Sequence, residues 1–203
     1  RSRSACRSAV AVQRFQELQS NSKLRENLIK RDLIIRAMRE WFYREGFVEV
    51  ETPRMVKYPG MEPYLDPFPT TVRNERGEDF SAHLITSPEY AMKKLLAAGF
   101  DKIFDIGKVF RNGESFGGVH NPEFTMIEWY QARSDYRDLM VDAEKMITFV
   151  INSITKEAET DRAISNFKFQ ISNEISKILE YQNLKIDISL PWERLSMKDV
   201  FRK

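Results

Sequence analysis

Hydrophobic residues recur at helical spacing in two long segments of the chain. Steps of three and four residues predict one helix from Asn27 to the stop signal Gly46 and another after Tyr136. The apolar positions of the first helix are Ile29, Leu33, Ile34, Ala37, Met38, Trp41 and Phe42. Those of the second helix are Leu139, Ala143, Met146, Ile147, Val150, Ile151 and Ile154.

Shorter segments between these helices have the composition of strands. GFVEVETP, residues 46–53, predicts a short strand that is closed by proline, which cannot donate a ladder hydrogen bond. Residues 82–85 predict a second strand, followed by a helix over 90–98. Ser87 is the candidate N-cap of that helix, and Pro88 is its first residue.

Two other regions have weaker patterns. Residues 57–69 contain four of the chain's eight prolines, which predicts irregular structure. The region after the second long helix is ambiguous, but residues 171–181 favour a helix. At the end of the chain, Ser196 and Asp199 have the spacing of a capped helix start.

Residues 102–111 and 123–130 are β-prone and flank a glycine-rich loop, so they predict a hairpin with chemistry on one face. Side chains alternate between the faces of a strand. One face of the second strand therefore carries Phe124, Met126, Glu128 and Tyr130. The matching set on the first strand is Asp105, Gly107, Val109 and Arg111. An acid and a phenol on a covered face favour a cationic ligand; a solvated sheet face is the alternative.

Composition changes this picture only slightly. The chain has 203 residues, 42% hydrophobic and 31% charged, and a formal net charge of +2, as expected for a soluble globular domain rather than a dedicated nucleic-acid binder. It contains no apolar run long enough to span a membrane. Cys6 is the single cysteine, so no disulfide framework is possible and a cytoplasmic location is expected. The Arg- and Ser-rich residues 1–20 fit either a transit peptide or a terminal extension.

Three sequence blocks resemble one enzyme family. FRNGESFGGVHNPEFTMIEWY resembles motif 2 of the class II lysyl-tRNA synthetases, GFVEVETP resembles their motif 1, and TSPEYAMKKLL resembles the segment that holds the amino acid. The resemblance implies an α+β fold, a partial class II synthetase-like domain with an antiparallel sheet flanked by helices. It would occupy residues 27–203, with motif 1 at about 27–53 and motif 2 at about 102–130. Residues 1–26 would be an N-terminal extension, for which disorder is one interpretation.

The residues of two of these motifs favour one branch of this family. TSPEY and MIEWY resemble the elongation factor P lysine ligases, and too few residues precede motif 1 for an anticodon-binding barrel. This resemblance implies ATP-dependent activation of lysine or β-lysine and transfer to a lysine of elongation factor P. The alternative is a lysine–tRNA ligase core that acts on tRNA-Lys. A second alternative is a non-catalytic paralogue or binding module.

The resemblance also implies roles for individual residues. Arg111 would be catalytic and would bind the α-phosphate of ATP and the substrate carboxylate. The other ATP-binding residues would be Asn112, Glu114, His120, Asn121 and Phe124, the last stacking on adenine. The substrate would be held by Ser87, Pro88 and Glu89, and its side-chain ammonium by Glu128 and Tyr130.

The chain departs from the family pattern at several points. Gly113 intervenes after FRN, and Val119 stands where a loop arginine is expected. Nothing after Tyr136 resembles motif 3, so we expect a catalytic domain truncated before that motif, with weak or no activity by itself. The carboxylates that bind Mg²⁺ in the family would lie in that missing part, and no metal ligand is assigned here. Motif 1 predicts a homodimer, and no membrane partner is expected.

Overall fold

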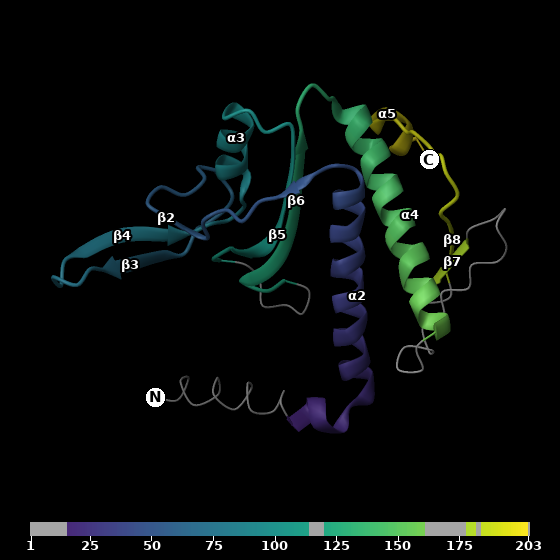
Figure 1. Ribbon diagram of the computed structural model, residues 1–203, viewed down its shortest axis with the longest axis horizontal. Helices are drawn as coiled ribbons and strands as arrows, with labels where there is room; N and C mark the ends of the chain where they lie inside the picture. The colour runs from purple at the N-terminus through teal and green to yellow at the C-terminus, as the bar shows by residue number, and fades with distance from the viewer. Residues whose placement is uncertain (1–15, 114–119, 161–177, 182–183, 203) are drawn as a thin grey trace. The chain divides into compact units, whose positions relative to one another are not determined.

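The computed structural model describes residues 16–113, 120–160, 178–181 and 184–202, shown in Figure 1. The chain divides into two compact units, one of Phe42–Asp135 and the other of the residues before and after it. Helices and mostly antiparallel strands alternate along the sequence, so the predicted α+β class is confirmed.

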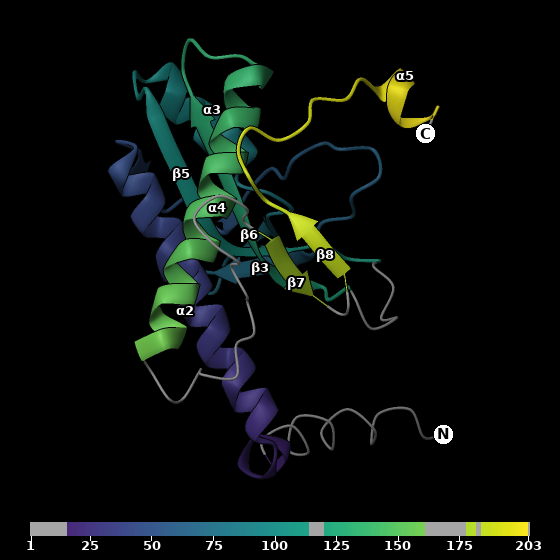
Figure 2. The same cartoon turned by 90° about the vertical axis from the view of Figure 1, so that its right-hand side faces the viewer.

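Two long helices dominate the unit formed by the two ends of the chain. They are α2, Ser22–Arg44, whose last turn enters the other unit, and α4, Tyr136–Thr160. Figures 1 and 2 both draw α4 alongside α2. Their buried apolar side chains are Leu33, Ala37, Trp41 and Phe42 of α2 and Met146, Val150, Ile151 and Ile154 of α4. This burial agrees with the predicted apolar stripes, except that Ile29, Leu139 and Ile147 are exposed.

The segment after α4 contains a small hairpin and a terminal turn of helix. Strand β7, Ile178–Tyr181, pairs antiparallel with β8, Leu184–Asp187. The helix predicted over 171–181 is therefore wrong for 178–181, because the described residues form ladder hydrogen bonds there, and 171–177 lie outside the described residues. The predicted cap is confirmed: Ser196 accepts from the backbone N–H of Asp199 at the start of α5, Met197–Val200.

The described C-terminal segment is tied to α4 through a buried carboxylate. Glu144 accepts a hydrogen bond from Arg194 Nη1 at 2.8 Å and another from the Trp192 backbone N–H at 3.1 Å. The hydrogen bond from Arg194 lowers the pKa of Glu144 below its usual value. Arg194 thereby provides a charged partner for an acid on the buried face of α4.

The other unit contains two three-stranded sheets and one helix. The first sheet has the order β1-β5-β6, in which β1 (Val48–Glu49) runs parallel to β5 (Lys102–Phe110), and β6 (Glu123–Gln131) runs antiparallel to β5. The second has the order β2-β4-β3, made of Met55–Val56, Asp79–Leu84 and Pro69–Arg73. Helix α3 spans Glu89–Ala97. The predicted hairpin of 102–111 and 123–130 is confirmed as β5 and β6.

Several predicted boundaries in these units differ from the structure. Helix α2 begins at Ser22 rather than Asn27, and residues 16–20 are helical as well. The domain boundary after residue 26 stays a prediction. The irregular stretch predicted over 57–69 ends one residue early, because Pro69 opens β3. Pro88, not Ser87, is the N-cap of α3, although Ser87 Oγ accepts weakly from the Glu89 N–H at 3.4 Å.

Aromatic packing anchors the first sheet. Phe42 and Phe104 are fully buried and stack with ring centroids 4.5 Å apart. Phe47 packs against Phe42 edge-on at 5.1 Å, and Trp129 lies at 5.6 Å from it. Removal of one such buried ring costs about 3–5 kcal/mol of folding stability. The β5–β6 hairpin is thereby held on a rigid base.

Candidate active site

The β5–β6 ladder brings the predicted chemical groups to one face. Residues directly opposite each other in an antiparallel pair project to the same side of the sheet. The register pairs Asp105 with Glu128, Gly107 with Met126, and Val109 with Phe124. The two sets derived from alternation therefore form one surface, as predicted.

Glu128 and Tyr130 form the acidic end of this face. The Tyr130 hydroxyl donates to Glu128 Oε1 at 2.5 Å, and both side chains are half-buried. Burial raises the pKa of Glu128 above its usual value, the charges of Glu89, Asp105 and Glu62 raise it further, and the hydrogen bond from Tyr130 opposes the shift. Burial and the bond to Glu128 also raise the pKa of Tyr130. The arrangement favours a cation, which would relieve this concentration of negative charge.

Arg111 stands at the opposite end of the same face. Its guanidinium carbon lies 5.3 Å from the centroid of the Phe124 ring, and its Nε donates to the Thr86 carbonyl at 3.4 Å. Its backbone N–H donates to the carbonyl of Pro122 at 2.9 Å, which fixes the end of β5. Because Phe124 shares a face with Glu128, the arginine is on the side of the acid and the phenol.

The segment before α3 and the first turn of this helix lie beside the same face. Glu89 lies in the first turn of α3, and its Oε1 pairs with Lys93 Nζ at 2.5 Å, one turn further along. Glu89 is close enough to Glu128 to influence its pKa. The Thr86 hydroxyl is buried and has no hydrogen-bond partner among the described residues. The predicted substrate segment of Ser87, Pro88 and Glu89 therefore borders the face that carries Glu128.

The remaining predicted nucleotide residues are placed unevenly. Asn112 donates its backbone N–H to the Asp66 carbonyl at 2.7 Å and its Nδ2 to Asp66 Oδ2 at 3.1 Å, so its side chain holds the 57–68 segment in this structure. His120 and Asn121 are exposed. Glu114 lies outside the described residues. The ATP-binding roles of these residues stay predictions.

Sequence reasoning missed a polar network that is part of this face. Asp105 is 1% exposed, and its carboxylate accepts hydrogen bonds from Arg54 Nη2 and, at 2.7 Å, from Thr52 Oγ1. An acid in the centre of the apolar strand KIFDIGKVF was the available signal, since a buried carboxylate requires a partner. Nothing in the local pattern identified Arg54 as that partner.

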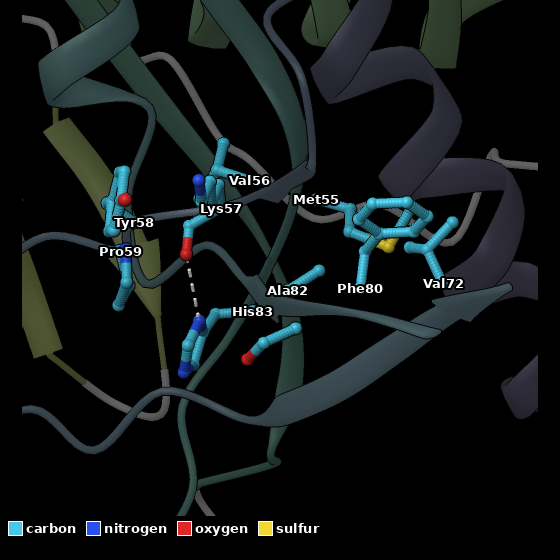
Figure 3. Close-up of a pocket in the computed structure, with 10 residues that line it drawn as sticks. Met55, Val56, Lys57, Tyr58, Pro59, Val72, Phe80, Ala82 and His83 are labelled. Atoms are coloured by element: carbon cyan, nitrogen blue, oxygen red, sulfur yellow. Dashed lines mark hydrogen bonds between the residues drawn. The ribbon is translucent and has the colours of Figure 1, made fainter. Parts of the chain in front are cut away.

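Two cavities of this unit lie beside the face rather than on it. One, of about 490 Å³, is bordered by Ser87 and Pro88 together with Tyr90 and Lys94. The other, of about 460 Å³, lies between β2 and the β3–β4 hairpin. Figure 3 shows Met55, Val72 and Phe80 of the second cavity lying together, apart from the His83 ring, whose Nδ1 is 3.3 Å from the Lys57 carbonyl oxygen. Neither cavity is lined by a residue that sequence reasoning assigned to ATP.

No helix among the described residues is both long and apolar enough to cross a bilayer. No group of three or more histidine, cysteine, aspartate or glutamate side chains among them could hold a metal ion. The face described above carries two arginines, an aromatic ring, a phenol and a set of carboxylates.

Comparison with known proteins identifies the context of this arrangement. The family model described as class II tRNA synthetases (D, K and N) matches residues 8–203. Lysine–tRNA ligases are similar to the chain: that of Clostridium botulinum is 35% identical over 191 residues, covering 94% of the chain and 33% of the relative. Those of Chlamydia caviae (36% identical, 92% and 32%) and Carboxydothermus hydrogenoformans (35% identical, 91% and 33%) agree.

The chain spans about a third of the length of these curated relatives. Its motif-like segments fall on β1, on the start of α3 and on the β5–β6 hairpin, and β1 belongs to the same sheet as β5 and β6. Since the family model covers nearly all of the sequence, the chain belongs to the class II tRNA synthetases of the D, K and N group.

Proposed function

We propose that this chain supplies the amino-acid-activating face of a lysine–tRNA ligase, which joins lysine to ATP as lysyl-adenylate and passes the lysyl group to tRNA-Lys. The observation that supports it is the pairing of Glu128 with Tyr130 on the face that also carries Arg111. An acid–phenol pair suits the lysine ammonium, and an arginine suits a carboxylate or phosphate.

The relatives favour tRNA over elongation factor P as the acceptor. The similar proteins named above are lysine–tRNA ligases, which agrees with the alternative inferred from the sequence. Transfer to elongation factor P, inferred from the wording TSPEY and MIEWY, and the use of β-lysine gain no support from these relatives. The experiment described below tests both alternatives.

Within this proposal, the chain's own residues bind and align the reactants. Glu128 and Tyr130 hold the side-chain ammonium, while Glu89 lies near the second amino group of the substrate. Arg111 binds the substrate carboxylate and the α-phosphate, so that the carboxylate oxygen attacks phosphorus and pyrophosphate leaves. No protein nucleophile is needed, because alignment and charge neutralisation lower the barrier.

ATP fits the residues that are present. Phe124 offers a ring for adenine and Arg111 a guanidinium for the phosphate, and the two lie next to each other. Asn112, His120 and Asn121 are proposed to hold the rest of the nucleotide. Mg²⁺ is expected to accompany ATP and to neutralise phosphate charge, but the described residues contain no cluster of ligands for it. No step above is assigned to the metal.

Dimer formation through motif 1 is part of the same proposal. Strand β1 is an edge strand of its sheet, and Val48 within it is 49% exposed. Nearby Tyr43 is 52% exposed. An edge strand with exposed apolar side chains can pair with the same strand of a second copy.

The direct experiment is ATP–pyrophosphate exchange with the full-length protein, with lysine, β-lysine and arginine as substrates. Lysine-dependent exchange is expected, and exchange with arginine should be absent. Subsequent transfer is measured with radiolabelled lysine and either tRNA-Lys or elongation factor P as acceptor. The absence of exchange with lysine and β-lysine would refute the proposal. Transfer to elongation factor P alone would show that this protein, and not tRNA-Lys, is the acceptor.

A further inference from the structure

A second arginine lies on the face between its acidic end and its phosphate-binding end. Arg54 follows the motif 1 segment, and its Nη2 pairs with Asp105 Oδ1 in the middle of β5. Its Nη1 donates to Thr52 Oγ1 at 3.3 Å, and the Thr52 hydroxyl in turn donates to Asp105 at 2.7 Å. Since Asp105 and Thr52 are buried, they hold the guanidinium in one orientation.

Gly107 makes room for this guanidinium. A Cβ atom built on Gly107 would collide with the Nη2 and Cζ atoms of Arg54. The arginine therefore lies flat against the strand, in the space where a side chain would project. Gly107 pairs with Met126, between the Asp105–Glu128 pair and the Val109–Phe124 pair. Arg54 thus lies along the line that joins the ammonium-binding pair to Arg111.

The guanidinium keeps hydrogen-bonding capacity for a ligand. Arginine has five N–H donors, and the contacts within the described part of the chain are those to Asp105 and Thr52, with none from Nε. The Arg54 side chain is 26% exposed, whereas Asp105 is 1% exposed. The guanidinium is therefore anchored through Nη1 and Nη2 while part of its surface stays exposed.

We propose that Arg54 is a second carboxylate-binding residue, which holds the carboxylate of the amino acid whose ammonium is paired with Glu128. The inference rests on the proposed function, because it takes an amino acid as the ligand of this face. A substrate that reaches from Glu128 to Arg111 must pass over Gly107, where Arg54 lies. Arg54 would bind the carboxylate from one side, while Arg111 binds the same carboxylate together with the α-phosphate.

The test compares lysine with lysinamide, which keeps both amino groups and lacks the carboxylate charge. Dissociation constants are measured by calorimetry for the wild-type full-length protein, Arg54→Gln, and the double variant Arg54→Gln with Asp105→Asn. The double variant removes the arginine without leaving a buried unpaired carboxylate, so that the fold is preserved. Arg73→Gln is the matched control, because Arg73 pairs with Asp79 on the exposed β3–β4 hairpin.

We expect lysine to bind the double variant about tenfold to a hundredfold more weakly than the wild type, the usual range for a charged hydrogen bond. Lysinamide affinity should change by less than about twofold, and Arg73→Gln should change neither affinity. Equal losses for lysine and lysinamide would overturn the proposal, since Arg54 would then act only by orienting Asp105. An unchanged lysine affinity would overturn it as well.

The proposed function has its own readout in the same experiment. If the wild type binds neither compound and shows no lysine-dependent exchange, the lysine assignment fails, and the role of Arg54 fails with it. If the wild type binds lysine and the ratio of the two affinities is the same in every variant, only the role of Arg54 fails.

Discussion

Asp105 and Glu128 lie directly opposite each other on β5 and β6, two carboxylates on one face of an antiparallel pair. Like charges in this position are destabilising. Each acid has its own compensating partner, Arg54 for Asp105 and the Tyr130 hydroxyl for Glu128. Asp105 is buried and has a charged partner, whereas Glu128 keeps a raised pKa and one neutral partner. The predictions below follow from this difference.

Replacing Glu128 by Gln should weaken selection for the lysine ammonium. Loss of one charge-assisted hydrogen bond corresponds to ~1.5–3 kcal/mol, so kcat/KM for lysine in ATP–pyrophosphate exchange should fall by roughly one to two orders of magnitude. Tyr130→Phe should have a smaller effect, because it removes a neutral group. A Glu128→Gln variant with unchanged kcat/KM for lysine would show that the ammonium binds elsewhere.

Arg111→Ala should abolish adenylate formation while the fold is retained. Arg111 is half-buried, and within the described part of the chain its side chain makes one hydrogen bond, at 3.4 Å to the Thr86 carbonyl, so its removal should cost little stability. The measurement is exchange activity together with the thermal midpoint. Arg133→Ala serves as the control, because Arg133 forms an exposed pair with Asp101 away from the face. Exchange left intact in Arg111→Ala would contradict the assigned role.

The raised pKa of Glu128 predicts two effects of pH. A carboxyl whose pKa is raised by folding binds its proton more tightly in the folded state, so its charge weakens the fold as pH rises through the raised value. Glu128→Gln should therefore increase the free energy of unfolding at pH 7, and the gain should disappear below the pH at which an ordinary glutamate is protonated. Urea titrations at pH 7 and pH 4 measure this difference.

The second effect of pH concerns lysine binding. The ammonium requires the ionised form of Glu128, so lysine affinity should fall with decreasing pH, beginning above the range in which ordinary glutamates titrate. The Glu128→Gln variant should lose this acid limb. If the limb persists unchanged in that variant, another carboxylate is responsible for it.

Gly107→Ala should disturb the site from within the sheet. The added methyl group collides with the Arg54 guanidinium, so the variant should lose about 1–3 kcal/mol of stability and bind lysine more weakly. Lys108→Ala is the matched control, because Lys108 is the next residue of β5 and its side chain is 50% exposed. Equal stability of the two variants would indicate that Arg54 can move away at no cost.

Phe42→Ala should destabilise the unit that carries the face. Phe42 is fully buried against Phe104, and such a deletion costs about 3–5 kcal/mol. Phe80→Ala on the exposed β4 strand should cost less than about 1 kcal/mol, since Phe80 is 53% exposed. Chemical denaturation of both variants gives the comparison. Similar losses would mean that the aromatic cluster is not the base of the sheet.

The local pattern of the sequence determined the long helices and the chemical face. The apolar spacing of α2 and α4, and the alternation along residues 102–111 and 123–130, follow from helix and strand geometry, which depend on nearby residues. Alternation placed Glu128, Tyr130 and Phe124 together before any register was known, and the observed register agrees. The three motif-like blocks were also sufficient to identify the family, which the family model confirms.

Tertiary structure alone decided which distant groups became partners. Arg54 and Asp105 are 51 residues apart, and Asn112 and Asp66 are 46 residues apart, so no local period links them. The strand at 178–181 likewise depends on its pairing with 184–187, which overrode a helical pattern. Periodicity identifies which side of an element is buried, whereas the choice of a charged partner depends on which atoms meet once the chain has folded.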